Sequence, residues 1–579
     1  MAAHVRRQIR FGPYEVDVSA GEIRKHGRRV RLQEKPFRIL EALLEYPGEV
    51  VGRDELRARL WPADTFVDFD TGLNSAVNKV RRALGDSAAH PVYVETLGRR
   101  GYRFRAPVEA PEAPPPAGGP VPSPPAITSL AVLPLANLSG DERETYFCDG
   151  MTEALIAQIA GIRALRVISR QSIVRYKDSR MPLPAIAREL RVDGLIGGSV
   201  LRDGGRVRIG VQLVEGATDR HVWNGRWERE LQDVLVIQSE IATAVARAVA
   251  AAITDDEQSR LARARDIDPT AYDLYLKGRY FWRSRTREGL LRSVEYYRKA
   301  LALDPQFALA HAAEAESLGP LGYLAFVPPG ESSPAMRAAA TRALAIDPSL
   351  VEGLTALGAC EAFHEWRWRD SEEHFKRAIA VNPNYSTAFL WYGKALEIEG
   401  RFDESLAATR RGVALDPLSL RARAALAWAL CMNGDADEGL HEFDSVLELD
   451  PHNFFGLRDR AVVHASSGRP GEAAAAFVST NELGSLVHAL AVDGRRAGAC
   501  DVLARLEAAS RDVYISPLQF AVAYLGLEQT ERVWATLERG VDTRAVDLAG
   551  VRVDPRFASL RGDARFDAVL ARMGLPPSR

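Results

Sequence analysis

Cysteine is scarce in this chain of 579 residues. Its four cysteines lie far apart and form no CxxC pair: Cys148, Cys360, Cys431 and Cys500. A structural zinc site of the common kind needs closely spaced cysteines, and a disulfide framework needs a dense set of them. The sequence therefore predicts neither, and it favours a reducing compartment, the cytoplasm.

Long apolar runs are absent as well. No stretch of 18 or more apolar residues occurs, and the best candidate, 241–253, is interrupted by Thr243 and Arg247. The first residues, MAAHVRRQIRFGPYE, contain no apolar segment of the length found in a signal peptide. We therefore expect no membrane partner.

The sequence also has few patterns that carry catalysis. The glycine pairs at 197–198 and 204–205 lack the spacing of phosphate-binding loops. The run from His364 to Asp370 begins like HExxH but has no second histidine. One acidic cluster can be interpreted as a carboxylate site or as a solvated helix cap, and we favour the cap: Asp141, Glu142, Glu144 and Asp149. We predict no enzyme, no metal site and no cofactor.

Charge is present but unevenly distributed. The formal net charge of the chain is -2. Residues 1–108 hold 20 Lys and Arg against 14 Asp and Glu, whereas the remainder holds 55 against 63. A basic head on an acidic body fits a head that binds phosphate and a body that does not.

The most informative segment of the head is 71–84, where helical periodicity separates two faces. Leu73, Val77, Val80 and Leu84 share one face and are predicted to point at a core. Polar residues occupy the other side, among them Asn74, Asn78, Arg81 and Arg82. Asp70 or Thr71 can cap the start of this helix and Gly85 its end.

A basic hairpin is predicted directly after this helix. Strands over 93–96 and 102–105 flank the turn Gly98–Gly101, which carries Arg99 and Arg100. Asparagine can pair with adenine, arginine with guanine, and hairpin arginines can reach phosphate or the minor groove. The polar face could equally be only solvated, but its coupling to a basic hairpin favours a duplex-binding element.

The whole of 8–106 resembles the OmpR/PhoB-type winged-helix DNA-binding domain. A strand meander over 14–32 and helices over 34–46 and 53–60 precede the polar-faced helix. The resemblance rests on three runs: EKPFRILEALLEYPGEVVGRDELRARLW, LNSAVNKVRRALGD and YVETLGRRGYRF. It implies a recognition helix in the major groove and a wing at 97–102. Only about ten residues precede the domain, so control by phosphorelay through a receiver domain is not expected.

The resemblance also implies which residues contact DNA. We expect Asn74 and Asn78 at base edges, and Arg81 and Arg82 at phosphate or guanine. Tyr102 follows the turn of the wing, and the sequence allows it to be either a DNA contact or a core residue. The full set of candidate DNA-binding residues is Thr71, Asn74, Asn78, Lys79, Arg81, Arg82, Arg99, Arg100 and Tyr102. The loop 61–70 carries Asp64, Asp68 and Asp70, and either it touches RNA polymerase or it is merely solvated.

Behind the head we expect a linker and a second domain. Residues 109–127 are rich in proline and predict an extended spacer. Residues 128–254 alternate strand and helix patterns, which predicts an α/β domain with a mixed sheet. The phrases AVLPLANLSGDE, FCDGMTEALI and DGLIGGSVLRDGGRVRIGVQLV resemble the TolB N-terminal/FlgO-like domain. The chain resembles a soluble variant of CadC/ToxR-like regulators.

From about residue 268 to 575 the chain repeats. Asp-Pro or Asn-Pro recurs at steps near 34 residues, the period of tetratricopeptide (TPR) repeats, and predicts about seven of them. One longer step contains 318–333, which we expect as an inserted loop. Such arrays have a concave groove that binds peptides or helices. Trp366, Trp368 and Trp391 are candidates to line it, with packing as the alternative.

Together these patterns predict a multidomain α+β protein: a winged helix-turn-helix head, an α/β middle domain and an all-α TPR solenoid. We expect a transcriptional regulator that binds double-stranded DNA, with a protein or peptide partner in the TPR groove. RNA polymerase and a second copy of the chain on DNA are further expected partners. The alternatives are an interaction scaffold with accessory DNA binding and, less favoured, a nucleotide-linked enzyme.

Overall fold

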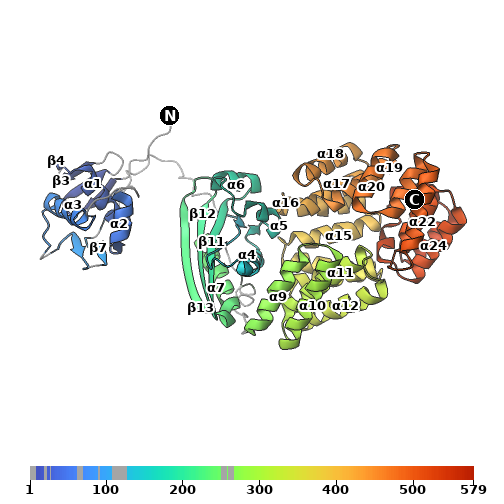
Figure 1. Ribbon diagram of the computed structural model, residues 1–579, viewed down its shortest axis with the longest axis horizontal. Coiled ribbons are helices and arrows are strands. Elements are labelled where there is room, and N and C mark those ends of the chain that lie inside the picture. The colour runs from blue at the N-terminus through green and yellow to red at the C-terminus, as the bar shows by residue number, and fades with distance from the viewer. Residues whose placement is uncertain are drawn as a thin grey trace. The chain divides into compact units, whose positions relative to one another are not determined.

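The computed structural model forms two compact units, Met1–Pro122 and Ser123–Arg579 (Figure 1). It describes residues 8–17, 22–25, 28–30, 32–60, 69–88, 91–98, 100–106, 108, 127–249, 254, 257 and 267–578. Within these residues no helix is both long enough and apolar enough to cross a membrane.

The first unit combines a strand meander, three helices and a second small sheet. Strands β1 to β4 pair in sequence order, and β5 and β6 both pair with β7 in antiparallel fashion. The elements are β1 Gln8–Phe11, β2 Tyr14–Asp17, β3 Glu22–Lys25, β4 Arg28–Val30, α1 Glu34–Glu45, β5 Val50–Gly52, α2 Arg53–Leu60, α3 Phe69–Leu84, β6 Val94–Thr96 and β7 Gly101–Phe104. The expected helices are confirmed within two residues, whereas β1, which lies before the expected meander over 14–32, and β5 were not predicted.

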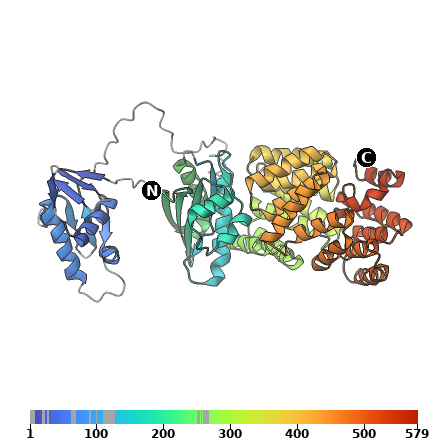
Figure 2. The same cartoon turned by 90° about the horizontal axis from the view of Figure 1, so that it is seen from above.

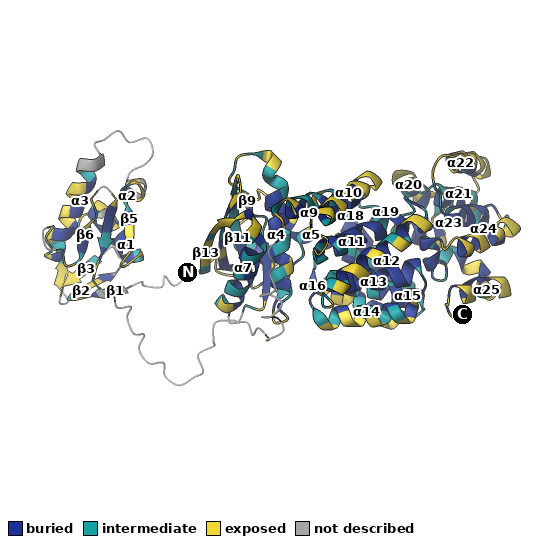
Figure 3. Cartoon of the chain, turned by 90° about the horizontal axis from the view of Figure 1, so that it is seen from below, coloured by how far each residue is buried: buried dark blue, intermediate teal, exposed yellow. Residues whose placement is uncertain are grey.

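One core holds the first unit together. Leu40 and Leu43 of α1 are fully buried, as are Val80 of α3 and Phe104 of β7. Helices α1 and α3 therefore pack against each other and leave one side of α3 outside the core (Figure 3).

The second unit begins with a mixed sheet. Its strands run in the order β10-β8-β11-β12-β13, with β9 beside β11. Helices α4 and α7 cover one face of this sheet (Figures 1 and 2). The elements are β8 Ser129–Val132, β9 Ala136–Asn137, α4 Thr145–Ala160, β10 Arg166–Val167, α5 Arg170–Ile173, α6 Leu183–Leu190, β11 Gly194–Asp203, β12 Arg206–Glu215, β13 His221–Glu230 and α7 Val234–Ala248.

Antiparallel helix pairs follow the sheet. Over 267–578 we count eight pairs, α9/α10 to α23/α24, against about seven repeats expected. They are α9 Pro269–Trp282, α10 Arg287–Leu303, α11 Ala308–Tyr323, α12 Pro329–Ile346, α13 Val351–Ala359, α14 Trp368–Val381, α15 Ser386–Ile398, α16 Phe402–Leu415, α17 Leu420–Asn433, α18 Ala436–Leu449, α19 Phe454–Ser466, α20 Pro470–Thr480, α21 Leu483–Val492, α22 Arg496–Ala509, α23 Pro517–Gly526, α24 Thr530–Asp542 and a closing α25 Ala564–Arg572.

The repeat residues that fix the sequence period lie in the core. Tyr297, Phe375 and Phe443, eight residues before the periodic prolines, are fully buried. The expected inserted loop at 318–333 is wrong, because α11 continues through Pro320 to Tyr323 and α12 already begins at Pro329. The additional residues of this repeat lengthen its two helices.

Ion pairs and hydrogen bonds join the sheet domain to the array. Arg283, the residue directly after α9, pairs with Asp149 of α4 at 2.8 Å, and Arg279 of α9 pairs with Glu153. Farther along, the Asn384 side chain donates to the Leu165 carbonyl oxygen at 2.7 Å. Asp149 thus belongs to a structural ion-pair cluster, rather than to the solvated cap that we expected.

Candidate nucleic-acid interface

Helix α3 presents a polar stripe because its apolar residues are used by the core. Leu73, Val77, Val80 and Leu84 are each at most 2% exposed, as the periodicity predicts. On the opposite side the side chains are exposed: Asn74, Ser75, Asn78, Lys79 and Arg82. The helix therefore offers two amides and two cations to a partner.

The end of α3 is coupled to the wing hairpin by one carboxylate. Gly85 has φ +63°, the left-handed conformation expected for a helix C-cap. The next residue, Asp86, accepts backbone N–H bonds from Val92 and Val94 at 2.7 Å, from Tyr93 at 3.1 Å and from Ser87 at 2.9 Å. Asp86 therefore fixes where β6 begins relative to α3.

Burial raises the pKa of Asp86, but these four N–H groups outweigh it, so the net pKa lies below its ordinary value of 3.8. A lowered folded-state pKa means that the contribution to stability is present above the unfolded pKa and is lost as pH falls through the folded one.

We expect Asp86→Ala to lower the free energy of unfolding of the first unit by about 2–3 kcal/mol at pH 7, because several donors lose a charged acceptor. Urea unfolding of the full chain, followed by loss of DNA binding, measures this at pH 7, pH 4 and pH 3. The gap between variant and wild type should be largely retained at pH 4, which lies above the ordinary pKa of 3.8, and should shrink at pH 3. Glu49→Ala, which removes a carboxylate from an exposed loop position, is the control. An equal loss at pH 7 and pH 3 would contradict the role given to the Asp86 carboxylate.

Arg81 corrects the sequence prediction. It is only 6% exposed, and its guanidinium donates to the Val94 carbonyl oxygen at 2.9 Å and to Thr96 Oγ1 at 2.7 Å. A guanidinium bound in this way cannot reach a phosphate or a guanine without leaving the hairpin. Arg81 therefore joins helix and wing, and we withdraw it as a DNA contact.

Tyr102 is a core residue, and its hydroxyl group helps to fix the orientation of the Asn74 side chain. It is 2% exposed, and Oη donates to Asn74 Oδ1 at 2.6 Å. Arg53, the first residue of α2, donates to the same Oδ1 at 3.0 Å and to Tyr102 Oη at 3.2 Å. Since Arg53 has only donors, the amide oxygen of Asn74 must face it and the amide NH2 must face outward.

The remaining candidates divide into described and undescribed residues. Asn78 and Arg82 make no side-chain hydrogen bond or ion pair within the described part of the chain, and Arg100 is exposed. Lys79 donates to Gln33 Oε1 at 2.8 Å, which leaves two of its three protons. Arg99, Asp64 and Asp68 lie outside the described residues, as do the side chains of Asp70 and Thr71.

Sequence reasoning missed Arg53 and Asp86, both of which position the site. A helical or strand period gives no signal for either, because both act through contacts to other elements: Arg53 bonds to Asn74 and Tyr102, and Asp86 bonds to four backbone N–H groups ahead of and in β6. Asp86 directly after a glycine C-cap was the one available signal, since such a carboxylate lies beside the N–H groups of the chain that leaves the helix.

Two family models match this chain. One is described as "Transcriptional regulatory protein, C terminal" and matches residues 27–104. Residues 27–104 are a DNA-binding domain of the transcriptional-regulator type. The other model, "Tetratricopeptide repeat", matches 359–420 and 424–479. The predictions of a winged-helix head and a TPR array are confirmed.

Relatives of the winged-helix protein cover different shares of it. The Putative adenylate cyclase 3 of Rhizobium meliloti is 33% identical over 47% of this chain and 44% of its own length. The Transcriptional regulator HilA of Salmonella typhimurium is 23% identical over 74% of both chains. The Transcriptional activator CadC of Escherichia coli is 29% identical over 17% of this chain and 19% of its own.

These matches support the expected class, a DNA-binding transcriptional regulator that also has a protein-interaction array. The chain spans less than half of the adenylate cyclase relative and about three quarters of HilA. The TolB N-terminal/FlgO-like resemblance of the middle domain stays a prediction.

Proposed function

We propose that this protein regulates transcription by placing α3 in the major groove of duplex DNA, with the wing on the backbone or in the minor groove. The observation that carries the proposal is the exposed stripe of α3, whose amides and cations lie opposite its buried face. Amides can read base edges, and cations can neutralise phosphate.

Base reading and phosphate contact are separable by mutation. We expect Asn78→Ala to cost about 1–3 kcal/mol at one base position and to relax the preference there. Arg100→Ala should instead weaken binding to all sequences alike and reduce the salt slope by about one. Selection of sites from a random duplex pool by the full chain, followed by titration at several salt concentrations, measures both.

Arg180→Ala, an exposed arginine of the second unit, is the matched control for lost charge. Equal loss of base selectivity in Asn78→Ala and Arg100→Ala would contradict the two roles. Failure of the full chain to select any site would reject DNA reading and favour the interaction scaffold.

The TPR array supplies the second half of the proposal, which is control by a protein or peptide partner bound in its groove. The sheet domain and the array share ion pairs, which offer a route by which a partner in the groove could influence both parts. Contact of the loop 61–70 with RNA polymerase and pairing of two copies on adjacent half-sites complete the proposal. Because its target is duplex DNA, we place the protein in the cytoplasm.

We further propose that the chain acts by binding and not by catalysis. Within the described residues no cluster of three or more His, Cys, Asp or Glu is arranged to hold a metal ion. One relative is named an adenylate cyclase, so release of cyclic nucleotide from ATP by the purified chain is the measurement that would revive the enzyme.

A further inference from the structure

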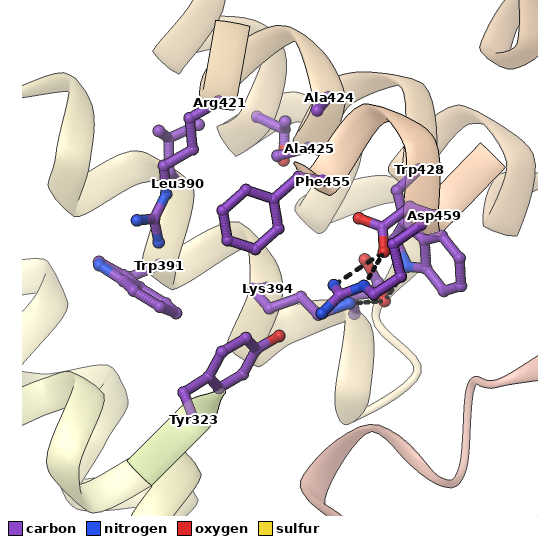
Figure 4. Close-up of a pocket in the computed structure, with 13 residues that line it drawn as sticks. Tyr323, Leu390, Trp391, Lys394, Arg421, Ala424, Ala425, Trp428, Phe455 and Asp459 are labelled. Carbon is purple, nitrogen blue, oxygen red and sulfur yellow. Dashed lines mark hydrogen bonds and ion pairs between the residues drawn. The ribbon is translucent and has the colours of Figure 1, made fainter. Parts of the chain in front are cut away.

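The first helices of successive repeats form one wall of the array, and a pocket opens on this wall. Helices α11, α15, α17 and α19 contribute most of its side chains, with one from α16. Its empty space, including the open solvent at its mouth, is about 610 Å³. Figure 4 shows Tyr323, Trp391, Arg421 and Phe455 converging on this space. We call it the groove pocket.

Most charges of the groove pocket are already compensated. Lys394 pairs with Glu397 at 2.8 Å, and Trp428 Nε1 donates to the same Glu397 carboxylate at 2.7 Å. Arg458 pairs with Asp459 at 2.8 Å. The charges of these four groups therefore sum to zero, so these groups do not attract an ion into the pocket.

Arg421 is the exception. Its guanidinium lies 4.4 Å from the centre of the Trp391 ring and 5.7 Å from that of Phe455. It makes no hydrogen bond or ion pair with any residue that the structure describes. Burial lowers the pKa of Arg421 below its ordinary value, so the surroundings disfavour its charge.

A second unpaired arginine contributes to the same field. Arg285 lies 3.8 Å from the centre of the Trp282 ring, and its side chain has no hydrogen bond or ion pair among the described residues. Its pKa is lowered by burial first and by the charge of Arg421 second. The Glu316 carboxylate, which pairs with Arg279 at 2.7 Å, offsets part of the repulsion between these two guanidinium groups. Neither Arg421 nor Arg285 bonds to it, so a further anion beside Arg421 would stabilise the guanidinium charge.

We infer that the groove pocket binds an acidic peptide segment of a partner protein, with an Asp or Glu carboxylate on Arg421 and an apolar or aromatic neighbour against Trp391 and Phe455. The inference rests on the proposed use of the TPR groove for a protein partner and names the chemistry of that partner. A guanidinium stacked on an indole keeps its N–H edge free, and that edge matches a carboxylate in two parallel hydrogen bonds. The aromatic walls add affinity only for a ligand with apolar surface, which favours a peptide over a free inorganic anion.

The test is selection of peptides by the full-length chain from a library of random 12-residue sequences. We expect enrichment of Asp or Glu beside an aromatic or aliphatic residue. For a synthetic copy of the best peptide, Arg421→Ala should weaken binding at least tenfold, and replacing the acidic residue by its amide should weaken wild type equally. In Arg421→Ala that amide replacement should cause no further loss. Arg421→Lys, which keeps the charge but not the planar fork, should fall between.

Controls separate this inference from the function on which it rests. Arg410→Ala removes an exposed arginine of the array outside the pocket and should bind like wild type; thermal unfolding of each variant checks that the array is folded. Peptides that bind without acidic preference, or independently of Arg421, overturn the inference and leave the groove function standing. No enriched peptide overturns both, while DNA selection by the same preparation still tests the winged helix. If inorganic phosphate binds in an Arg421-dependent way and no peptide is enriched, the ligand of the pocket is a phosphate and not a peptide, and the inference is rejected.

Discussion

Replacing Gly101 by alanine is expected to destabilise the winged-helix unit by about 3–5 kcal/mol, since steric overlap and backbone strain each cost about 1–3 kcal/mol. Gly101 has φ +143°, and a Cβ there would lie 2.1 Å from the carbonyl oxygen of Val51 and 2.9 Å from its carbonyl carbon. The obstructing atoms are backbone of β5, which pairs with β7 at Gly52 and Gly101. The neighbour cannot rotate away, so the pairing of these strands must open.

The measurement is thermal unfolding of the full chain with DNA binding as the readout of the first unit. Each kcal/mol shifts the midpoint of a domain of this size by about 4–8 °C, so we expect a fall of at least about 12 °C. Gly98→Ala is the matched control, because Gly98 is in the same turn with φ +57° but has nothing within 4 Å of a new Cβ. It should cost only the strain of about 1–2 kcal/mol. Equal effects of the two changes would show that strain alone, and not contact with β5, makes Gly101 necessary.

Periodicity was sufficient to predict the three helices of the head but not β5 or the contacts between the elements. The positions of α1, α2 and α3 follow from apolar residues at helical spacing, which the core then buries. The same spacing placed Arg81 on the polar face. Its long side chain instead folds back to the Val94 carbonyl oxygen, 13 residues away along the chain, and no local pattern encodes that contact.

In the array, the repeat period predicted which residues lie in the core better than it predicted which residues line the groove. Trp366 and Trp368 were candidates to line the groove, but each is 8% exposed, and Trp368 Nε1 donates to the Met573 carbonyl oxygen at 2.8 Å. Trp391, the third candidate, does line the groove pocket. A tryptophan at a repeat position has the same sequence signal in both cases, so the neighbouring helices decide which role it takes.

Because its amide oxygen is already bonded, Asn74 is expected to donate hydrogen bonds to acceptor atoms of a base and not to form the bidentate contact with adenine. Oδ1 already accepts from Tyr102 Oη and from Arg53, so only the NH2 group is available to DNA. A bidentate contact with adenine requires both the oxygen and the NH2 group of an asparagine, whereas guanine presents two acceptors, N7 and O6, in the major groove. We therefore correct the expectation of an adenine contact at Asn74 and keep it for Asn78, whose amide makes no bond to described residues.

Asn74→Ala should abolish the base preference at one position of the selected site. In the wild-type chain, site selection should give guanine at that position, with a preference of about 1–3 kcal/mol over adenine. Tyr102→Phe alone leaves Arg53 on the amide oxygen and should keep the preference. The double variant Arg53→Ala, Tyr102→Phe frees the amide to turn, so adenine should then be accepted as well as guanine. The position assigned through Asn78→Ala is the internal control and should be unchanged. Adenine at the Asn74 position in wild type would mean that binding breaks both hydrogen bonds, and would contradict the orientation that Arg53 and Tyr102 impose.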